Sequence, residues 1–183
     1  MMTLTDDNKY VREHIRIVPD FPKKGIMFLD ITTAIKDAHA MQVMTDYLYE
    51  QFKNMEVDYV AGIESRGFIF GAALAYKLGC GFITIRKPNK LPAKTIKEDY
   101  TLEYGTNTIE IHEDALKKGD RVVVIDDLLA TGGTAIAACK LINRIGAEVV
   151  STAFIIELNP LKGREKIEAE GFKVISMLDY DLD

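Results

Sequence analysis

The stretch that decides the fold is residues 122–134, VVVIDDLLATGGT. Its first four residues are apolar and β-branched, which predicts a strand buried on both faces. Asp126 and Asp127 follow where this strand is expected to end. The turn that comes next consists of Ala130, Thr131, Gly132, Gly133 and Thr134. The apolar run AIAACKLI after the turn predicts a helix.

This order of groups is typical of a binding site for a phosphate attached to a sugar. The free amides of a glycine turn at a helix N-terminus bind an anion. Carboxylates accept charge-assisted hydrogen bonds from sugar hydroxyls, each worth roughly 1.5–3 kcal/mol. The turn has no Lys-Ser or Lys-Thr pair, unlike a Walker A loop, and its acids precede its glycines, unlike the dinucleotide fingerprint. The alternative is a plain strand-to-helix turn with exposed acids.

The composition is that of an ordinary globular protein, and we expect one domain over residues 1–183. The net charge of −5 argues against general nucleic-acid binding, which needs a basic face. No apolar run approaches the roughly 18 residues of a membrane span, and the polar first ten residues predict no signal peptide. Cys80 and Cys139 show no pairing pattern, so we expect reduced thiols and a cytoplasmic protein. The histidines have no zinc-type spacing.

Helical and strand patterns alternate along the chain. Periodicity and cap residues predict helices over residues 5–17, 41–52, 67–79, 134–145 and 159–171. Short apolar runs predict strands over residues 57–63, 81–86, 121–125, 148–156 and 173–178. We expect the helix over 67–79 to be buried all round, and residues 88–107 to form a long loop. The alternation indicates an α/β fold whose parallel sheet is covered on both faces and binds ligands at the carboxyl ends of its strands.

On these residues the chain resembles the type I phosphoribosyltransferases, whose motif for phosphoribosyl pyrophosphate (PRPP) matches residues 122–134. The similarity runs from about residue 17 to 166 and is strongest to the adenine-specific members. It implies transfer of the 5-phosphoribosyl group from PRPP to N9 of adenine, giving AMP and pyrophosphate, with Mg²⁺ bound with PRPP. It also implies a single-domain parallel-sheet fold with an N-terminal hood over about residues 1–35, a flexible lid loop over about 88–107, and a homodimer.

The resemblance assigns the phosphoribosyl part of PRPP to the motif described first. Asp126 and Asp127 would hold the ribose hydroxyls, and residues 130–134 would hold the 5′-phosphate of PRPP or AMP. The aspartates would orient a metal that PRPP carries, so no direct metal ligand is expected from the protein.

The pyrophosphate of PRPP is assigned to two further segments. Residues 64–68, ESRGF, follow a predicted strand at the same edge of the sheet. There Ser65 and the cation Arg66, also a candidate catalytic residue, would bind the leaving pyrophosphate. The resemblance implies a cis peptide before Ser65. Lys87 and Lys90, in the basic run RKPNKLPAKTIK (86–97), match the family's phosphate-contacting lysines.

The catalytic glutamate of the family matches Glu103, in the segment YTLEYG (100–105). We expect Glu103 to handle a proton at the purine imidazole ring, an effect usually worth roughly 10²–10⁴-fold in rate. Tyr104 would line the closed lid. Closure of the lid would exclude water from an oxocarbenium-like ribose centre.

The purine-binding hood of the family resembles residues 19–28, PDFPKKGIMF. Phe28 would stack on one face of the base and Leu158 on the other, while the backbone of Met27 reads the base edge. Adenine offers an amino donor and a ring acceptor there, whereas hypoxanthine and guanine reverse that pattern. The family usually has an arginine after this phenylalanine, and this chain has Leu29.

Two alternatives stay open at this point. The same chemistry could act on hypoxanthine or guanine. A non-catalytic regulator that senses PRPP could also use this fold, but it would need a nucleic-acid-binding surface or an added domain. The acidic net charge and the lid glutamate argue against the regulator.

Overall fold

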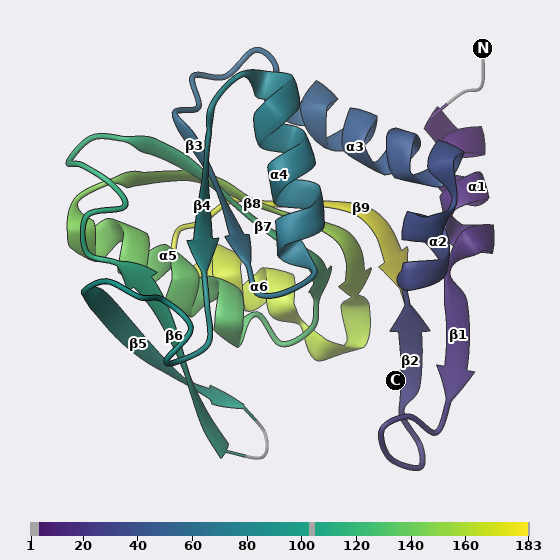
Figure 1. Cartoon of the computed structure of the whole chain (residues 1–183). Helices are drawn as coiled ribbons and strands as arrows, with labels where there is room; N and C mark the ends of the chain where they lie inside the picture. The colour runs from purple at the N-terminus through teal and green to yellow at the C-terminus, as the bar shows by residue number, and fades with distance from the viewer. Residues whose placement is uncertain (1–3, 103–104, 183) are drawn as a thin grey trace.

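A computed structural model describes residues 4–102 and 105–182 of the chain. A five-stranded parallel sheet forms its centre, with helices on both faces and two antiparallel hairpins that project beyond the carboxyl ends of the strands, one on each side (Figure 1). The sheet contains β3 (Tyr59–Ile63), β4 (Gly81–Ile85), β7 (Arg121–Leu129), β8 (Glu148–Leu158) and β9 (Val174–Tyr180). The hairpins are β1 (Arg16–Pro19) with β2 (Met27–Asp30), and β5 (Thr95–Leu102) with β6 (Gly105–His112). The helices are α1 (Leu4–His14), α2 (Thr32–Lys36), α3 (Ala38–Phe52), α4 (Gly67–Leu78), α5 (Gly133–Ile145) and α6 (Gly163–Ala169), with a 3₁₀ turn η1 (Asn159–Leu161).

The order of the strands reverses in the middle of the sheet. The order is β4-β3-β7-β8-β9, and every neighbouring pair is parallel. The chain runs outward from β3 to β4, and later runs from β7 through β8 to β9 in the other direction. In open α/β sheets, ligands bind outside the carboxyl ends of the strands at such a reversal. The loops after β3 and β7 are therefore neighbours at the place where a ligand is expected.

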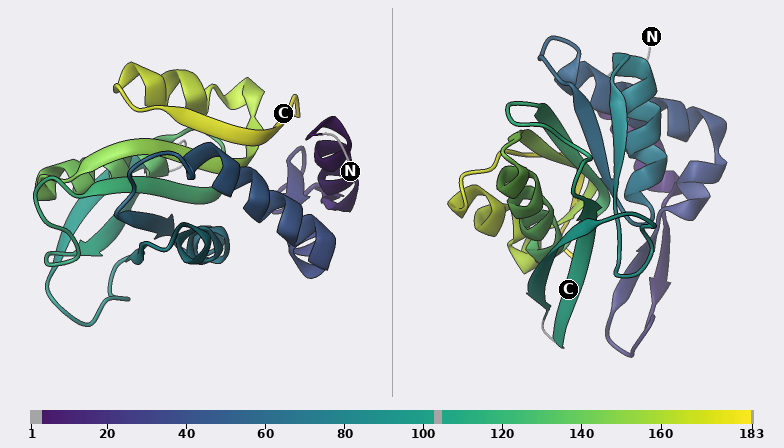
Figure 2. Two further views of the ribbon diagram at one scale, coloured as in Figure 1. Left: turned by 90° about the horizontal axis from the view of Figure 1, so that it is seen from above. Right: turned by 60° about the vertical axis from the view of Figure 1, so that its left-hand side comes forward.

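Both faces of β7 are buried, as its sequence predicts. Val123 and Ile125 lie in the core formed with α3 and α4, whereas Val122 and Val124 lie in the core formed with α5. All four side chains are fully buried, and their alternation follows from the pleat of a strand. Figure 2 shows α4 and α6 on opposite sides of the sheet. The predicted α/β fold with a covered parallel sheet is thereby confirmed.

The two hairpins flank the carboxyl ends of the sheet strands. Both project from the side toward which the arrowheads of β3 and β7 point (Figures 1 and 2). Hairpin β1–β2 lies within residues 1–35, expected to form a hood, and hairpin β5–β6 overlaps residues 88–107, expected to form a lid. Within the described part of the chain, no helix has the length and apolar character that a bilayer crossing requires.

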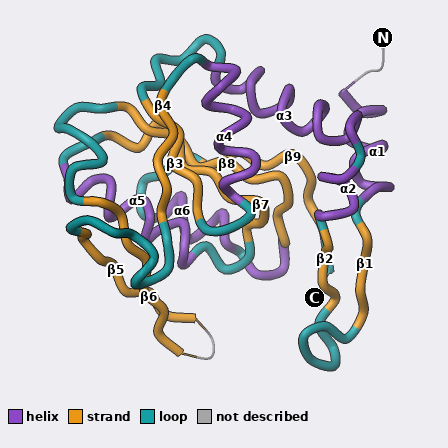
Figure 3. The backbone as a smooth tube through the Cα atoms, in the orientation of Figure 1, coloured by secondary structure: helices purple, strands orange, loops and turns teal. Residues whose placement is uncertain are grey.

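The sequence-based prediction is wrong for the segment after residue 88. Instead of a long loop, residues 95–102 and 105–112 form hairpin β5–β6 (Figure 3). Its apolar side chains pack on the core beside α5: Ile109 and Ile111 are buried, and Ile96 packs against them. This apolar face gives the segment a reason to be ordered, which its many charges conceal.

Other predicted helices and strands differ from the structure in their bounds or in their burial. The first helix ends at His14, and residues 16–19 pair with β2 instead of continuing the helix. The helix expected over 159–171 is divided into η1 and α6 at Lys162, whose φ is 54°. Helix α4 is not buried all round, because Tyr76 is 88% exposed. Strand β7 runs to Leu129, so the two aspartates lie within the strand and not beyond it.

The start of α4 lies against the end of β7 because Gly67 has no side chain. A Cβ at Gly67 would lie 2.6 Å from the carbonyl oxygen of Ile125 and 3.2 Å from the Cα of Asp126. This contact holds the loop after β3 directly beside the acidic pair of β7.

Replacing Gly67 with alanine should therefore destabilise the protein. Overpacking against a rigid backbone costs about 1–3 kcal/mol, more than the roughly 0.4–1 kcal/mol that Gly→Ala gains through the unfolded chain. For a domain of this size we expect the melting temperature to fall by about 2–4 °C per kcal/mol. Thermal and urea unfolding measure the change. Ala169→Ser, at an exposed position of α6, is the control, and an unchanged melting temperature for Gly67→Ala would contradict the tight contact.

Candidate active site

The turn between β7 and α5 lines a pocket whose backbone geometry suits an anion. Gly132 is the N-cap of α5 with φ of 82°, a left-handed conformation that favours glycine. The helical hydrogen bond from Ile136 N to Gly132 O, 3.0 Å long, leaves the amides of residues 133–135 at the open N-terminus. A cavity of about 100 Å³ lies here, lined by Asp126, Leu128–Ala135 and Phe154. The amides and the dipole of α5 favour a bound anion.

The acidic pair adjoins this pocket. The side chain of Asp127 is only 5% exposed, and its Oδ2 lies 2.8 Å from Nε of Arg66, which comes from the loop after β3. The Asp127 amide donates a hydrogen bond to Oδ1 of Asp126 at 2.9 Å. Burial and the neighbouring Asp127 carboxylate raise the pKa of Asp126 well above its usual range. The free protein therefore holds two crowded carboxylates that a ligand with hydroxyl groups can satisfy.

A second cavity, of about 310 Å³, also adjoins the pair and is lined by Glu64, Ser65, Arg66, Lys87, Asp126 and Asp127. The cis peptide expected before Ser65 is present. Both cavities share Asp126. The structure thus brings the acidic pair, the glycine turn, Ser65, Arg66 and Lys87 together around these two cavities.

Sequence reasoning missed the role of Glu64 and Arg86. The Glu64 carboxylate accepts hydrogen bonds from Nε of Arg86 and from the Lys87 amide, each 3.1 Å long. Burial raises the pKa of Glu64, but these hydrogen bonds and the charges of Arg86 and Lys90 outweigh burial and leave the pKa below its usual value. Glu64 therefore stays ionised and ties the segment that carries Lys87 and Lys90, called the lysine segment below, to the loop after β3. The position of Arg86, at the end of the strand predicted over residues 81–86, was the available signal.

The hood hairpin reaches the same place through Phe28. Its ring meets the Phe21 ring edge-on at 5.1 Å between centroids, and Cζ of Arg66 lies 5.8 Å from its centroid. Leu29 is buried in the main core, as the pleat of β2 requires for the neighbour of a half-exposed residue. Leu29, which stands where the family usually has an arginine, therefore faces the core and not the Phe28 side. Leu158 ends β8 and packs partly against the same core as Leu29.

Two predicted site residues, Glu103 and Tyr104, lie outside the described residues, and their roles stay predictions. Lys90 is exposed, and its carbonyl accepts a hydrogen bond from Nη1 of Arg86 at 3.2 Å. Within residues 4–102 and 105–182, no three His, Cys, Asp or Glu side chains come together as a metal cage.

Comparison with known proteins gives a consistent picture. Residues 32–181 match the family described as "Phosphoribosyl transferase domain". The chain is 53% identical over 173 residues to the adenine phosphoribosyltransferase of Chlorobium luteolum, which covers 93% of this chain and 98% of that protein. A solved adenine phosphoribosyltransferase from Thermoanaerobacter pseudethanolicus has 48% identity and a TM-score of 0.91, covering 94% of this chain and 99% of that one. The enzyme from Saccharomyces cerevisiae, solved with an imino-altritol bisphosphate and adenine, has 36% identity and a TM-score of 0.88, covering 95% and 99%.

Asp126→Asn should stabilise the free protein at neutral pH. The amide keeps the acceptor for the Asp127 N–H and removes a charge that burial and Asp127 disfavour. Because folding raises this pKa, the wild-type protein loses stability as pH rises from the ordinary value of 3.8 to the folded value, and the variant lacks that loss. We expect the gap in melting temperature to widen from about pH 4 to about pH 7.

Differential scanning calorimetry across this pH range measures the gap. Asp114→Asn, at an exposed site, is the matched control. A variant that melts at or below the wild-type temperature at pH 7 would show that Asp126 is not held at a cost.

Proposed function

The chain belongs to the phosphoribosyl transferase family, and from this premise we propose that it transfers the 5-phosphoribosyl group of PRPP to N9 of adenine, giving AMP and pyrophosphate. One observation carries the proposal: an anion-binding turn and an acidic pair adjoin at the reversal of the sheet order. Such a site suits a phosphate and a diol on one sugar. The relatives named adenine phosphoribosyltransferase, and adenine in the Saccharomyces cerevisiae structure, support adenine as the base.

In this proposal the 5′-phosphate binds to residues 130–134, through the amides at the start of α5 and the hydroxyls of Thr131 and Thr134. The ribose hydroxyls donate hydrogen bonds to Asp126 and Asp127. These bonds offset the crowding of the two carboxylates, and the remaining negative charge stabilises the positive charge that develops at C1′.

The pyrophosphate binds in the 310 Å³ cavity between the loop after β3 and the lysine segment. Arg66 is held by Asp127 with its guanidinium at the cavity wall, where it neutralises the leaving group as the C1′–O bond breaks. Ser65, Lys87 and Lys90 supply further donors. Glu64 supports this arrangement because it holds the Lys87 backbone.

The donor set fits Mg²⁺ that arrives with PRPP. The adjacent carboxylates of Asp126 and Asp127 can orient the hydroxyls and waters around a cation held by the substrate. When bound, Mg²⁺ neutralises charge on the diphosphate of PRPP.

Adenine binds between Phe28 and Leu158, with the Met27 backbone at its edge. Met27 lies opposite Pro19 in hairpin β1–β2, and a proline has no N–H to donate. The Met27 carbonyl is therefore not satisfied by Pro19 and can accept a hydrogen bond from the amino group of adenine. A 6-oxo purine would leave this acceptor unpaired, which supports selection against hypoxanthine and guanine.

Glu103 and Tyr104 complete the site in this proposal as the proton-handling group and the lid wall. The base of hairpin β5–β6 is anchored on α5, since Arg144 donates to the carbonyl of Lys97 at 2.7 Å and pairs with Glu98. An anchored base supports a lid over residues 88–107 that closes through the part farther from α5.

A steady-state assay with PRPP and Mg²⁺ tests this function. We expect AMP from adenine, no nucleotide from hypoxanthine, guanine, uracil or orotate, and loss of activity when Mg²⁺ is chelated. Glu103→Ala should lower kcat by about 10²–10⁴-fold, with an unchanged melting temperature. Glu113→Ala, an exposed carboxylate after the same hairpin, is the control. Failure to form AMP would refute the enzyme, and a wild-type kcat in Glu103→Ala would remove that residue from the mechanism.

We further infer a homodimer that forms through the exposed face of α4. Ile69 is 40% exposed and Tyr76 is 88% exposed, and Ala72 between them is exposed as well. Their spacing puts all three on one face of the helix, and an exposed apolar face of this kind favours a protein contact.

The free thiols Cys80 and Cys139 support a reducing, cytoplasmic location, which cell fractionation can test.

Changing Ile69 and Tyr76 together to aspartate should convert the dimer to a monomer, because two charges would be buried at the interface. Sedimentation velocity measures the change. Met55→Asp, which alters a residue 45% exposed elsewhere on the surface, should leave the dimer intact. A wild-type monomer, or a double variant that stays dimeric, would contradict this interface.

A further inference from the structure

Gly163, the first residue of α6, makes backbone contact with the turn proposed to bind the 5′-phosphate. This turn, residues 130–134, is called the phosphate loop below. A Cβ at Gly163 would lie 2.2 Å from the carbonyl oxygen of Ala130 and 2.8 Å from Cδ1 of Leu129. A Cβ at Gly132 would lie 2.9 Å from the carbonyl oxygen of Gly163. No side chain lies between these two backbones, so the position of Gly163 determines the path of residues 129–132.

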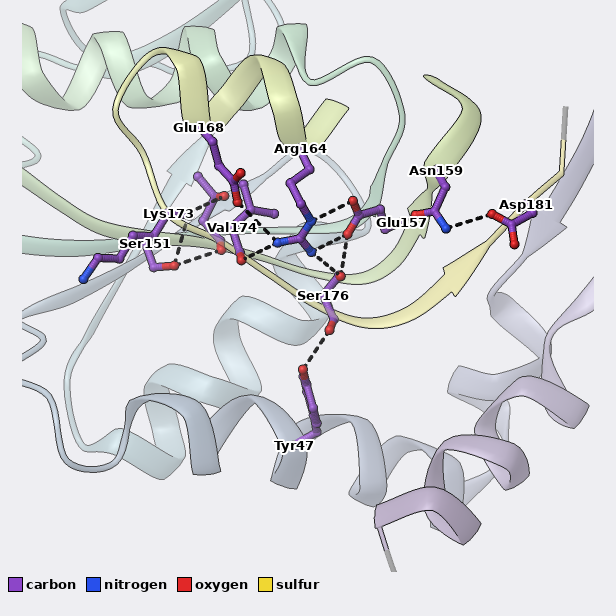
Figure 4. Close-up of polar contacts among 11 residues, drawn as sticks. Tyr47, Ser151, Glu157, Asn159, Arg164, Glu168, Lys173, Val174, Ser176 and Asp181 are labelled. Atoms are coloured by element: carbon purple, nitrogen blue, oxygen red, sulfur yellow. Dashed lines mark hydrogen bonds and ion pairs between the residues drawn. The ribbon is translucent and has the colours of Figure 1, made fainter. Parts of the chain in front are cut away.

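Arg164, the next residue, is tied to the sheet beneath it (Figure 4). Its Nε donates to Oε1 of Glu157 at 2.9 Å, its Nη1 to the carbonyl of Val174 at 2.9 Å, and its Nη2 to Oγ of Ser176 at 2.8 Å. The Ser176 hydroxyl donates to Oε2 of Glu157 at 2.6 Å, and the Ser176 carbonyl accepts from Tyr47 at 2.7 Å. One guanidinium thus joins the start of α6 to both β8 and β9.

This cluster helps to fix the start of α6, together with the buried Ile167, because the helix itself is weak. It has seven residues and follows Lys162, which interrupts the helical path at φ of 54°. So short a helix is not stable without tertiary contacts. Glu157 is 5% exposed, and although burial raises its pKa, the bonds from Arg164 and Ser176 outweigh burial and lower it. The ion pair therefore stays charged on both sides.

We propose that Glu157 and Arg164 are positioning residues for the 5′-phosphate of PRPP: by fixing Gly163, they hold residues 130–132 in the shape that receives the phosphate. None of the hydrogen bonds described above joins the side chain of Glu157 or Arg164 directly to the phosphate loop. The inference rests on the proposed function of residues 130–134 and extends it to a buried ion pair behind the loop.

Kinetics of Arg164→Met and of the double variant Glu157→Gln/Arg164→Met test the inference. We expect the KM for PRPP and the Kd for AMP to rise about tenfold or more, since small misplacements of binding groups have effects of this size or larger. The KM for adenine and kcat should stay within about twofold, because neither the base site nor the reacting atoms have moved. A merely structural role would lower the melting temperature without separating these constants.

The double variant keeps the test valid if Arg164→Met does not fold, since the single change leaves a buried carboxylate unpaired. Lys140→Met is the matched control: it breaks an exposed 3.3 Å ion pair with Glu170 at the other end of α6 and should leave all constants unchanged. Wild-type KM for PRPP and Kd for AMP in the folded double variant would overturn the inference, as would a parallel loss in all constants. If the wild-type protein bound neither PRPP nor AMP, the proposed function itself would fail, and this is measured before any variant.

Discussion

Strand β7 lies between two apolar layers, and its double burial is the constraint on which the site depends. Residues 122–125 send alternate side chains into the cores on the two faces of the sheet, so the strand must be central, with β3 and β8 beside it. All five strands are parallel, but the direction in which successive strands are added to the sheet reverses between β3 and β7. The loops after these two strands therefore lie side by side. Gly67 then brings the start of α4 into contact with Ile125 and Asp126. Core packing thus places three groups within one site: the loop that carries Arg66, the acidic pair and the N-terminus of α5.

The electrostatics of the free site explain why it suits an anionic sugar. Asp126 and Asp127 are adjacent at the end of a buried strand, and Arg66 pairs with Asp127, so Asp126 is left with burial and a neighbouring charge that raise its pKa. A ligand that brings hydroxyl donors lowers the free energy of this pair, and one that also brings phosphates satisfies the open amides and the cations around it. The arrangement sacrifices stability of the empty protein for affinity, as binding sites commonly do.

The parts of the site that could be predicted from the sequence are those whose signal is local. Residues 122–134 carry their own strand, acids and glycine turn, and the ESRGF segment follows a strand at once, so parallel topology was enough to bring them together. Contacts between distant segments gave no such signal. The face of hairpin β5–β6 that packs beside α5 is apparent only once Ile96 is paired with Ile111. The break at Lys162 requires a lysine in the left-handed backbone conformation, which residues other than glycine rarely adopt.

The ion pair between Glu157 and Arg164 belongs to the same class of non-local feature, and its chemistry suggests why it is not a pair of apolar residues. A buried ion pair adds little stability over well-packed hydrophobic groups, but its bonds are directional. Gly163 must approach the Ala130 carbonyl without a side chain between them, so a shift of α6 along the sheet would open or close the phosphate loop. Three acceptors fixed on β8 and β9, the Glu157 carboxylate, the Val174 carbonyl and the Ser176 hydroxyl, set that register more tightly than apolar contacts, which tolerate sliding. Since Leu158 follows Glu157 on the opposite face of β8, the strand end that supports the phosphate loop also carries the side chain proposed for the base.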